Sequence, residues 1–224
     1  MEQAVSTTKE ALLHAAGELF AEHGVEGTSI RAIAEKCKAN IAAVNYHFGT
    51  KENLYLVVIR HVLEQTRCYR AVELFKHRQE WEQEPVLCAE AIYRIVEEHI
   101  QQFFTGIHPR WYGRIFMRLM LQPTPAIWEI VAELVMPNID ALREVLKCCR
   151  PGMSKEEVDL WVDSLMGQLM HYVFAEDFLL IIPDHRKLSD AGYQKDILRH
   201  VTKTLIRGLE LPMPVFLEEG AVHA

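Results

Sequence analysis

The sequence lacks the motifs that most enzymes and metal sites require. It contains no HExxH, no GxSxG, no phosphate-binding P-loop and no GxGxxG. The sequence therefore gives no support for a zinc protease, for a hydrolase with a nucleophile elbow, or for a phosphate-binding loop that holds a nucleotide. The 11 histidines form no tight cluster with cysteine, and a packed or surface histidine explains each better than a metal ligand does. We predict a protein that is not an enzyme, with no catalytic residue, no metal and no cofactor.

Paired cysteines are also absent. The 5 cysteines include no CxxC pair and no zinc-ligand spacing; they are Cys37, Cys68, Cys88, Cys148 and Cys149. An odd count without an export signal is typical of reduced thiols in a cytosol, so we expect a cytoplasmic protein. The adjacent Cys148 and Cys149 could form a redox switch. Two small apolar residues near a helix end are the commoner explanation.

Long hydrophobic runs and a positive net charge are missing too. The apolar runs are far shorter than the ~20 residues that span a bilayer, so we expect no membrane partner. The net charge is −7, whereas a nucleic-acid-binding domain is more often basic. Residues 1–60 carry 6 basic and 7 acidic residues, and the remainder carries 18 basic and 24 acidic residues. Most of the acidity therefore lies outside the N-terminal segment.

Strand-like alternation does not extend beyond a few residues, whereas helical periodicity recurs along the chain. The pattern predicts an all-α fold. Expected helices include a long one over 51–75 and one over 125–149 that Pro137 kinks or splits. Ser154 and Glu157 form a capping box for another helix, and a last helix covers 190–209. We expect three parts: 1–53, a larger helical bundle over 54–211, and a loosely held tail over 212–224 that contains Pro212 and Pro214.

The most informative stretch is residues 28–51, TSIRAIAEKCKANIAAVNYHFGTK. Thr28 and Asn40 are suitable N-caps for two short helices. In the second helix, Ile41, Val44 and Phe48 recur at helical spacing and are expected to face inward. This leaves the side chains at the intervening positions for solvent or a partner. Two short helices joined by a tight turn are typical of a helix-turn-helix, whose second helix enters the major groove of DNA.

The segment from about Thr8 to Leu54 resembles the DNA-binding domain of TetR-type transcriptional regulators. The matching stretches are ALLHAAGELFAEHGVEGTSIRAIAEKC and ANIAAVNYHFGTKENLY, and the most specific feature is Tyr46-His47-Phe48 followed by Lys51-Glu52. The variant VNYHFGTKE, and RLMLQPTPA followed by a proline-containing helix, are similar to a smaller, CecR-like subgroup. The resemblance implies a three-helix N-terminal head and a larger helical bundle for ligand binding and dimerisation.

The resemblance also implies partners and site residues. The expected partners are a double-stranded DNA operator, a small hydrophobic effector and a second copy of the chain. The expected DNA-binding residues are Thr28, Ser29, Arg31, Asn40, Ala42, Ala43, Asn45, Tyr46, His47 and Lys51. The run Ala42-Ala43-Val44-Asn45 departs from the common family pattern, so base preference cannot be transferred. Lys51 and the Tyr46 hydroxyl suit phosphate contacts, whereas Asn45 suits an adenine edge.

The larger bundle offers candidate ligand-binding and interface residues. Arg114 and Arg118, one helical turn apart among aromatic residues and methionines, could hold a polar group of an apolar ligand, pair with internal carboxylates, or point outward. The expected ligand-binding residues are Trp111, Arg114, Met117, Arg118, Trp128, Met170 and Phe174. Residues with these spacings are also typical of ordinary core. The family resemblance implies a dimer interface on the last two helices, over about 154–182 and 190–209, and the residues expected there are Trp161, Leu165, Leu169, Val201 and Leu205.

The predicted function is that of a DNA-binding transcriptional regulator, a repressor that a small hydrophobic ligand releases from a palindromic operator. Two alternatives remain. One is a regulator whose larger domain only dimerises. The other is a helical dimerisation or protein-interaction module without ligand-gated DNA binding, which the acidic net charge favours.

Overall fold

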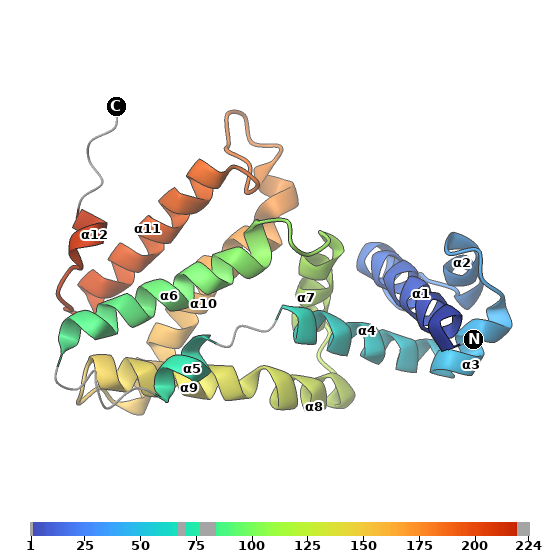
Figure 1. Ribbon diagram of the computed structural model, residues 1–224, viewed down its shortest axis with the longest axis horizontal. Coiled ribbons are helices and arrows are strands. Elements are labelled where there is room, and N and C mark those ends of the chain that lie inside the picture. The colour runs from blue at the N-terminus through green and yellow to red at the C-terminus, as the bar shows by residue number, and fades with distance from the viewer. Residues whose placement is uncertain (1, 67–69, 77–83, 219–224) are drawn as a thin grey trace. The chain divides into compact units, whose positions relative to one another are not determined.

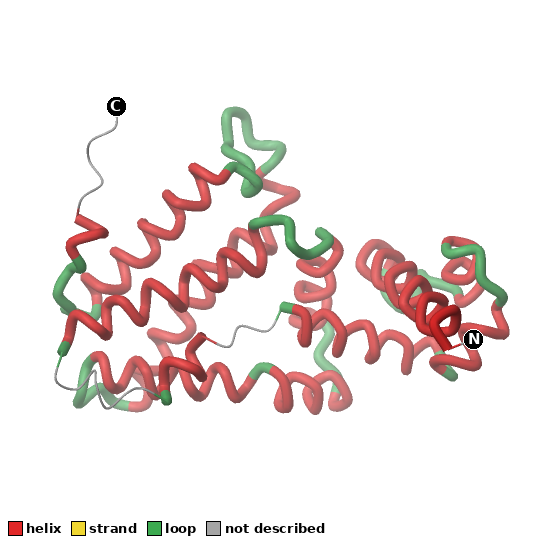
Figure 2. The backbone as a smooth tube through the Cα atoms, viewed as in Figure 1, coloured by secondary structure: helices red, strands yellow, loops and turns green. Residues whose placement is uncertain are grey.

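The computed structural model describes residues 2–66, 70–76 and 84–218, and these residues form helices without a strand (Figures 1 and 2). The chain divides into two compact units. The head unit comprises residues 1–66 and 108–134, and the body unit comprises residues 67–107 and 135–224. The all-α prediction is confirmed. The sequence suggested a boundary after residue 53, whereas the head unit continues through Thr66 and also takes in the later segment His108–Leu134.

Six helices build the head unit. They are α1 (Glu2–His23), α2 (Ile30–Lys36), α3 (Ile41–Phe48), α4 (Lys51–Gln65), α7 (Trp111–Leu121) and α8 (Pro125–Leu134). The helix α1 packs against α2, α4 and α7, and α4 packs against α8 (Figure 1). Phe20 of α1 is fully buried and meets Tyr55 of α4 edge-on, with ring centroids 5.3 Å apart. This aromatic pair lies in the small core that the first four helices share.

The loop between α1 and α2 differs from its prediction. Thr28 does not cap α2; Ser29 does, and its hydroxyl accepts a hydrogen bond from the Ala32 backbone amide at 3.0 Å. The Thr28 side chain is buried, and its hydroxyl lies 2.7 Å from the Gly24 carbonyl oxygen, to which it donates. The physical reason is that the last carbonyls of α1 lack helical partners and take a nearby donor.

The fourth helix is shorter than expected. It ends at Gln65 rather than near Phe75, and the Thr66 hydroxyl donates to the Val62 carbonyl oxygen at 2.7 Å. A separate helix, α5 (Arg70–Phe75), follows. Cys68 lies outside the described residues. The apolar spacing of the sequence continues past residue 65 and therefore did not indicate where the helix ends. A hydrogen bond from a hydroxyl group to the backbone at a helix end does not change that spacing.

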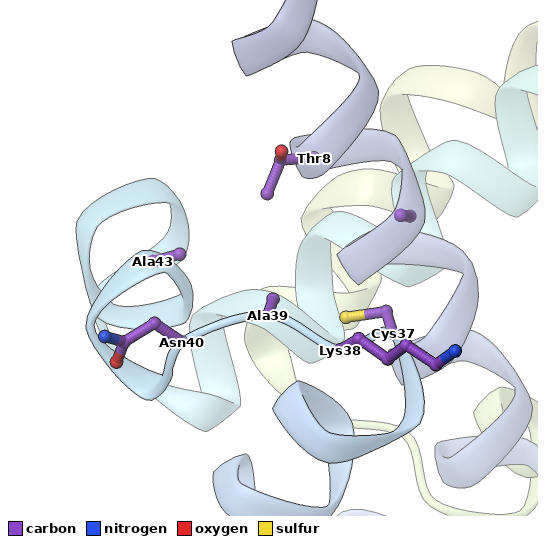
Figure 3. Close-up of a pocket in the computed structure, with 7 residues that line it drawn as sticks. Thr8, Cys37, Lys38, Ala39, Asn40 and Ala43 are labelled. Carbon is purple, nitrogen blue, oxygen red and sulfur yellow. The ribbon is translucent and has the colours of Figure 1, made fainter.

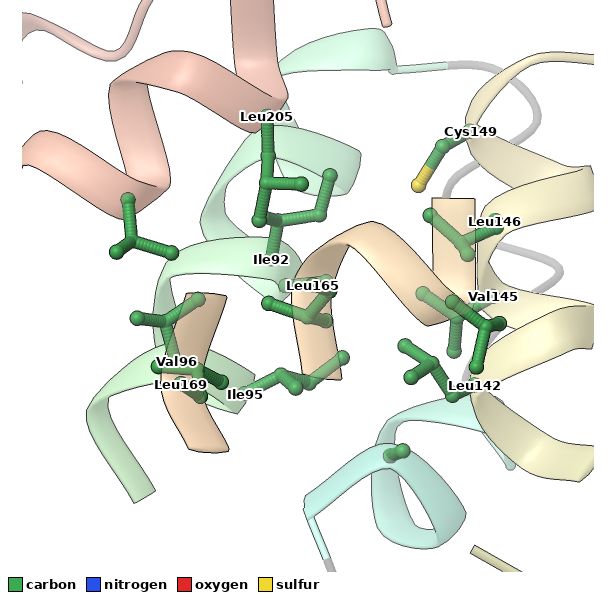
Figure 4. Close-up of a cluster of buried hydrophobic side chains, with 14 of the residues drawn as sticks. Ile92, Ile95, Val96, Leu142, Val145, Leu146, Cys149, Leu165, Leu169 and Leu205 are labelled. Carbon is green, nitrogen blue, oxygen red and sulfur yellow. The ribbon is translucent and has the colours of Figure 1, made fainter. Parts of the chain in front are cut away.

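The body unit consists of α5, α6 (Pro85–Phe104), α9 (Met136–Cys149), α10 (Lys155–Leu179), α11 (Ala191–Gly208) and α12 (Val215–Glu218). Its core draws one apolar face from each of α6, α9, α10 and α11 (Figure 4). The side chains that Figure 4 labels are Ile92, Ile95, Val96, Leu142, Val145, Leu146, Cys149, Leu165, Leu169 and Leu205. Cys149 is buried among them, which fits a small apolar packing residue.

Proline and capping residues define the helix boundaries of this unit. The segment 125–149 is split as expected: α8 ends at Leu134, and Pro137 lies in the first turn of α9. The capping box is present, since the Glu157 amide donates to the Ser154 hydroxyl at 3.2 Å and the Ser154 amide donates to the Glu157 carboxylate at 2.8 Å. These caps fix where α9 and α10 begin.

The segment after residue 211 is more ordered than its prolines suggest. Residues 215–218 form α12, and Leu217 is buried. The Arg199 guanidinium donates to the Leu217 carbonyl oxygen at 2.6 Å. The expected loosely held tail is therefore packed as far as Glu218, because one apolar side chain and one arginine hold it. Residues 219–224 lie outside the described part.

No described helix combines the length and apolar character needed to cross a membrane. The described ranges also contain no group of three or more His, Cys, Asp or Glu side chains that could hold a metal ion.

Acid should destabilise the fold through buried histidines. Burial lowers the pKa of His99 to about 4, and it also lowers the pKa values of His61 and His108. Because the folded-state pKa of His99 lies below its unfolded value, the unfolded chain binds the proton more tightly. The His99 contribution is fully present above about pH 6.5 and is lost as the pH falls toward 4, which amounts to about 3 kcal/mol.

Urea unfolding at a series of pH values measures this loss. His99→Phe, which keeps a ring beside Phe103, should flatten the decline between pH 6.5 and 4. An unchanged pH dependence in this variant would assign the loss to other groups.

Candidate nucleic-acid interface

The helix α3 has a buried face and an exposed face. Val44 and Phe48 are buried against the rest of the head unit. Tyr46 is 83% exposed, although it is a large aromatic residue. Ile41 was expected to face inward and instead is 45% exposed, because it occupies the first turn of the helix and extends past the small core. The exposed face of α3 is therefore polar at its centre and apolar at its start.

Local hydrogen bonds fix both ends of α3. The Asn40 side chain caps the start, since its carbonyl oxygen accepts from the Ala42 amide at 2.9 Å. At the other end, Gly49 has a positive φ of 74°, and its amide donates to the Asn45 carbonyl oxygen at 2.9 Å. The Asn53 side-chain amide then donates to the Phe48 carbonyl oxygen at 2.8 Å. These bonds connect the end of α3 firmly to the first turn of α4.

The turn between α2 and α3 contains a strained residue. Lys38 has a φ of +55°, in the left-handed region that glycine favours. The Ala39 amide donates to the Ala34 carbonyl oxygen at 2.9 Å, which is the 6→1 bond of a Schellman motif. The chain thus reverses sharply after α2 and enters α3 without a long loop.

A cleft of about 260 Å³ lies between α1 and this turn (Figure 3). Its lining residues are Thr8, Ala11, Cys37, Lys38, Ala39, Asn40 and Ala43. The cleft borders the start of α3 and is lined by small side chains apart from Lys38. The Cys37 thiol lies 3.4 Å from the Ile33 carbonyl oxygen, to which it donates, so its hydrogen-bonding capacity is used within α2.

Most of the predicted DNA-binding residues are accessible from solvent. The exposed residues are Ser29, Arg31, Asn40, Ala42, Asn45 and Tyr46, and the half-buried residues are Ala43, His47 and Lys51. Thr28 is buried and is engaged by α1. The Arg31 guanidinium lies 2.7 Å from the Glu35 carboxylate, an exposed pair that leaves Arg31 free to exchange its partner for a phosphate at little cost. The start of α2, the whole of α3 and the first turn of α4 carry this set.

The predicted ligand-binding residues do not fall in one unit. Trp111, Arg114, Met117, Arg118 and Trp128 belong to the head unit, and Met170 and Phe174 belong to the body unit. Arg114 is exposed, and Trp128 is largely exposed. At the end of α7, Met120 and Leu121 are exposed. Because α7 is apolar on nearly every side, its sequence did not show which side packs against other helices and which side is exposed to solvent.

Arg118 has a role that the sequence did not indicate. Its guanidinium donates to the backbone carbonyl oxygens of Ala21 and Glu22, at 3.0 and 2.9 Å. In these bonds Arg118 binds the C-terminal end of α1, which is a different role from the internal ion pair considered above.

The predicted dimer-interface residues lie largely inside the protomer. Leu165, Leu169, Val201 and Leu205 are buried in the core of the body unit. Trp161 is half-buried, and its ring covers Gly208 of α11. These residues do form an apolar face with helical spacing, but that face packs into the protomer's own core. The outward side of α10 instead carries the exposed Leu160 and Phe178.

Two family models match the chain. Residues 12–58 match bacterial regulatory proteins of the tetR family, and residues 88–209 match the C-terminal domain of the HTH-type transcriptional dual regulator CecR. The second match alone spans more than half of the 224 residues. The chain belongs to the TetR family. Its N-terminal part matches the tetR regulatory-protein model, and its body matches the C-terminal domain of CecR.

Curated relatives match part of the chain, and solved structures match its fold. The HTH-type transcriptional repressor Rv3405c of Mycobacterium tuberculosis is 50% identical over 52 residues, which are 23% of this chain and 28% of that protein. The chain covers less than a third of the length of the curated relatives that it matches. The fatty acid degradation regulator FadR from Bacillus halodurans has a TM-score of 0.61 at 15% identity, covering 91% of this chain and 97% of that one.

A second solved structure is AibR in complex with isovaleryl coenzyme A and operator DNA. Its TM-score is 0.59 at 17% identity, and the match covers 88% of this chain and 96% of that one. At such low identity, both structural likenesses show the fold of this TetR-family chain.

Sequence reasoning missed the long-range contacts that hold the head unit together. The Arg60 guanidinium of α4 forms two hydrogen bonds with the Glu133 carboxylate of α8, at 2.8 and 2.7 Å. The His61 ring and the Tyr112 hydroxyl are 2.9 Å apart. In each pair the partners are more than 50 residues apart in sequence, so no local spacing could have indicated them.

The strain at Lys38 predicts a stabilising substitution. Lys38→Gly should raise the free energy of unfolding by up to about 1 kcal/mol, because glycine adopts the positive φ without a Cβ clash, and its greater freedom in the unfolded chain offsets part of the gain. Urea denaturation measures the effect. Lys38→Ala removes the same charge and keeps the strain, so it should not stabilise; a lower midpoint for the glycine variant would contradict the account.

Proposed function

We propose that this TetR-family chain is a dimeric repressor that binds a palindromic operator and leaves it when a small hydrophobic molecule binds. The observation that carries the proposal is the exposed outer face of α3, on which Tyr46, Asn45 and Ala42 remain accessible while Val44 and Phe48 anchor the inner face. A large aromatic side chain that is 83% exposed costs apolar hydration unless a partner covers it.

DNA is the partner whose shape suits this surface. The major groove is about 12 Å wide and admits one α-helix. The small side chains of Ala42 and Ala43 allow α3 to approach the base edges closely. Asn45 can form two hydrogen bonds with an adenine edge. Lys51, in the first turn of α4, and the Tyr46 hydroxyl reach toward the backbone, where contacts set register rather than sequence preference.

The outward side of α10 is the proposed dimer surface. Leu160, Gly167 and Phe178 are spaced by 7 and 11 residues, close to whole helical turns, so they share one face. Leu160 and Phe178 are exposed, and a Cβ built on Gly167 would meet no atom within 4 Å. A second α10 can therefore approach closely at Gly167. Two heads joined in this way read half-sites about 34–36 Å apart, or a multiple of that distance.

The proposed effector is a small apolar molecule of the acyl class. The basis is the CecR-type body together with two structural neighbours, of which one is a fatty acid degradation regulator and the other was solved with isovaleryl coenzyme A. An effector releases DNA if it binds the DNA-incompatible form more tightly. A shift from 99% to 1% occupancy needs a preference of about 5.5 kcal/mol.

A gel shift with the DNA upstream of the chain's own gene tests the proposal. We expect a retarded band that weakens steeply with salt, depends on an intact inverted repeat and disappears with a short-chain or medium-chain acyl thioester. A protein that gives no sequence-dependent shift at low salt would refute repression by operator binding. A shift that no acyl compound affects would remove the effector part alone.

Two substitutions on the head unit should weaken binding in different ways. Lys51→Ala should lower affinity for all sequences to a similar degree and reduce the salt slope by about one phosphate contact, because a backbone contact carries no base information. Asn45→Ala should change base preference at one position per half-site. Selection of bound fragments from a random library measures both. The assigned roles are wrong if Lys51→Ala relaxes a single base position or Asn45→Ala leaves the preferred sequence unchanged.

The dimer surface predicts a matched pair of substitutions. Leu160→Glu should produce folded monomers, because it places a charge on the exposed face of α10 without touching the core. Val215→Glu, on the equally exposed first residue of α12, serves as the control and should leave the dimer intact. Light scattering gives the mass, and circular dichroism shows whether the helices remain. A Leu160→Glu protein that stays dimeric would move the interface elsewhere.

A further inference from the structure

The C-terminal end of α1 is held by a residue from a distant helix. An α-helix leaves its last four carbonyls without internal partners. In α1, two of them accept hydrogen bonds from Arg118 of α7, with Nε 3.0 Å from the Ala21 oxygen and Nη2 2.9 Å from the Glu22 oxygen. A cation at this end also favours the helix dipole. One guanidinium thus completes the end of α1 from almost 100 residues away in sequence.

These two hydrogen bonds from Arg118 are called the Arg118 clamp below. Close packing of α7 on α1 holds Arg118 in place to form them. A Cβ on Gly17 would lie 2.4 Å from two atoms of the Trp111 ring, so the indole occupies the space that any other side chain would fill. The His14 and Trp111 rings meet edge-on, with centroids 5.9 Å apart. Gly24, with a positive φ of 72°, leaves room for the Arg118 guanidinium, whose Nη1 would lie 3.0 Å from an added Cβ.

The clamped end leads directly to the proposed DNA-contacting residues. Gly24 turns the chain out of α1, and the Thr28 hydroxyl donates back to the Gly24 carbonyl oxygen at 2.7 Å. The next residue, Ser29, caps α2, and Arg31 lies in its first turn. The end of α1 and the start of α2 therefore form one hydrogen-bonded unit, and displacement of the first moves the second.

We propose that Arg118 is a positioning residue for DNA recognition: by holding the last carbonyls of α1, it fixes the start of α2 relative to α3. The inference rests on the proposed operator binding. Specific binding requires contacts from α2, α3 and α4 to form together, and ordering a loose element at the moment of binding lowers affinity. Non-specific binding depends on charge near the phosphates and tolerates imprecise placement. Loss of the clamp should therefore reduce specificity more than general affinity for DNA.

The competing explanation is that Arg118 only stabilises the fold. The two accounts differ in what they predict for Gly17→Ala. An added methyl collides with the Trp111 ring, so a purely structural view expects lower stability but no selective loss of operator affinity in the folded protein. The positioning account expects a defect, because the new methyl displaces Trp111 and with it α7.

The test uses the full-length dimer and two duplexes, the operator found by gel shift and a scrambled sequence of the same composition. Dissociation constants are measured for wild type, Arg118→Met, Arg118→Lys, Gly17→Ala and the control Lys147→Met. The fraction of each preparation that can bind DNA is determined by titration, so that the constants can be compared. Lys147 lies exposed on α9 beside Glu144, so its replacement removes one positive charge from the body unit and none from the head unit. Thermal unfolding confirms that each variant is folded at the assay temperature.

For Arg118→Met and Gly17→Ala we expect operator affinity to fall at least tenfold while affinity for the scrambled duplex changes less than twofold. Arg118→Lys should recover part of the loss, since it keeps the charge and one donor group but not the fork that reaches two carbonyls. Lys147→Met should match wild type. This pattern would support the positioning role, and the partial rescue gives a readout even if Arg118→Met unfolds.

Other outcomes overturn the inference. Folded Arg118 variants with wild-type operator affinity, or with equal losses on both duplexes, would leave Arg118 a structural residue. A Gly17→Ala protein that binds the operator normally would show that α7 docking does not control the head. If wild type itself shows no preference for the operator over the scrambled duplex, the proposed function fails and this inference fails with it.

Discussion

Val44 and Phe48 hold α3 against the head unit, and this contact determines which side chains of α3 remain outside. A helix of 8 residues has little stability of its own, so its orientation depends on the buried pair and on its caps. Asn40 fixes its start, and Gly49 and Asn53 fix its end. The exposed amide, phenol and methyl groups of its outer face follow from that anchoring, and the proposed recognition of DNA depends on them.

The head unit is more than a helix-turn-helix. It contains α7 and α8, which follow α6 in sequence but pack with α1 and α4. Arg118 joins α7 to α1, and Arg60 joins α4 to α8 through Glu133. The chain passes between the head unit and the body unit three times, after residues 66, 107 and 134. The two units are therefore joined at three points along the chain.

Local features were predictable from sequence and long-range partners were not. Asn40 and the Ser154–Glu157 box cap helices as expected, because capping needs residues only two or three positions away. Leu165 and Leu169 were assigned to a dimer surface, although they fill the protomer core. An apolar stripe has the same period whichever surface covers it. The partner of Arg118 is a pair of backbone carbonyls, which every residue carries, so no sequence pattern could identify it.

Hydroxyl-radical footprinting of the protein with and without its upstream DNA tests the central claim most directly. Tyr46 is the informative residue, because its ring is reactive and highly exposed in the free protein. The account predicts that DNA strongly reduces oxidation of Tyr46 and leaves Val215 and Phe216, on α12, unchanged. Full oxidation of Tyr46 in a chain that mobility shift shows to be bound to DNA would contradict it, because the outer face of α3 would then not be the surface in contact.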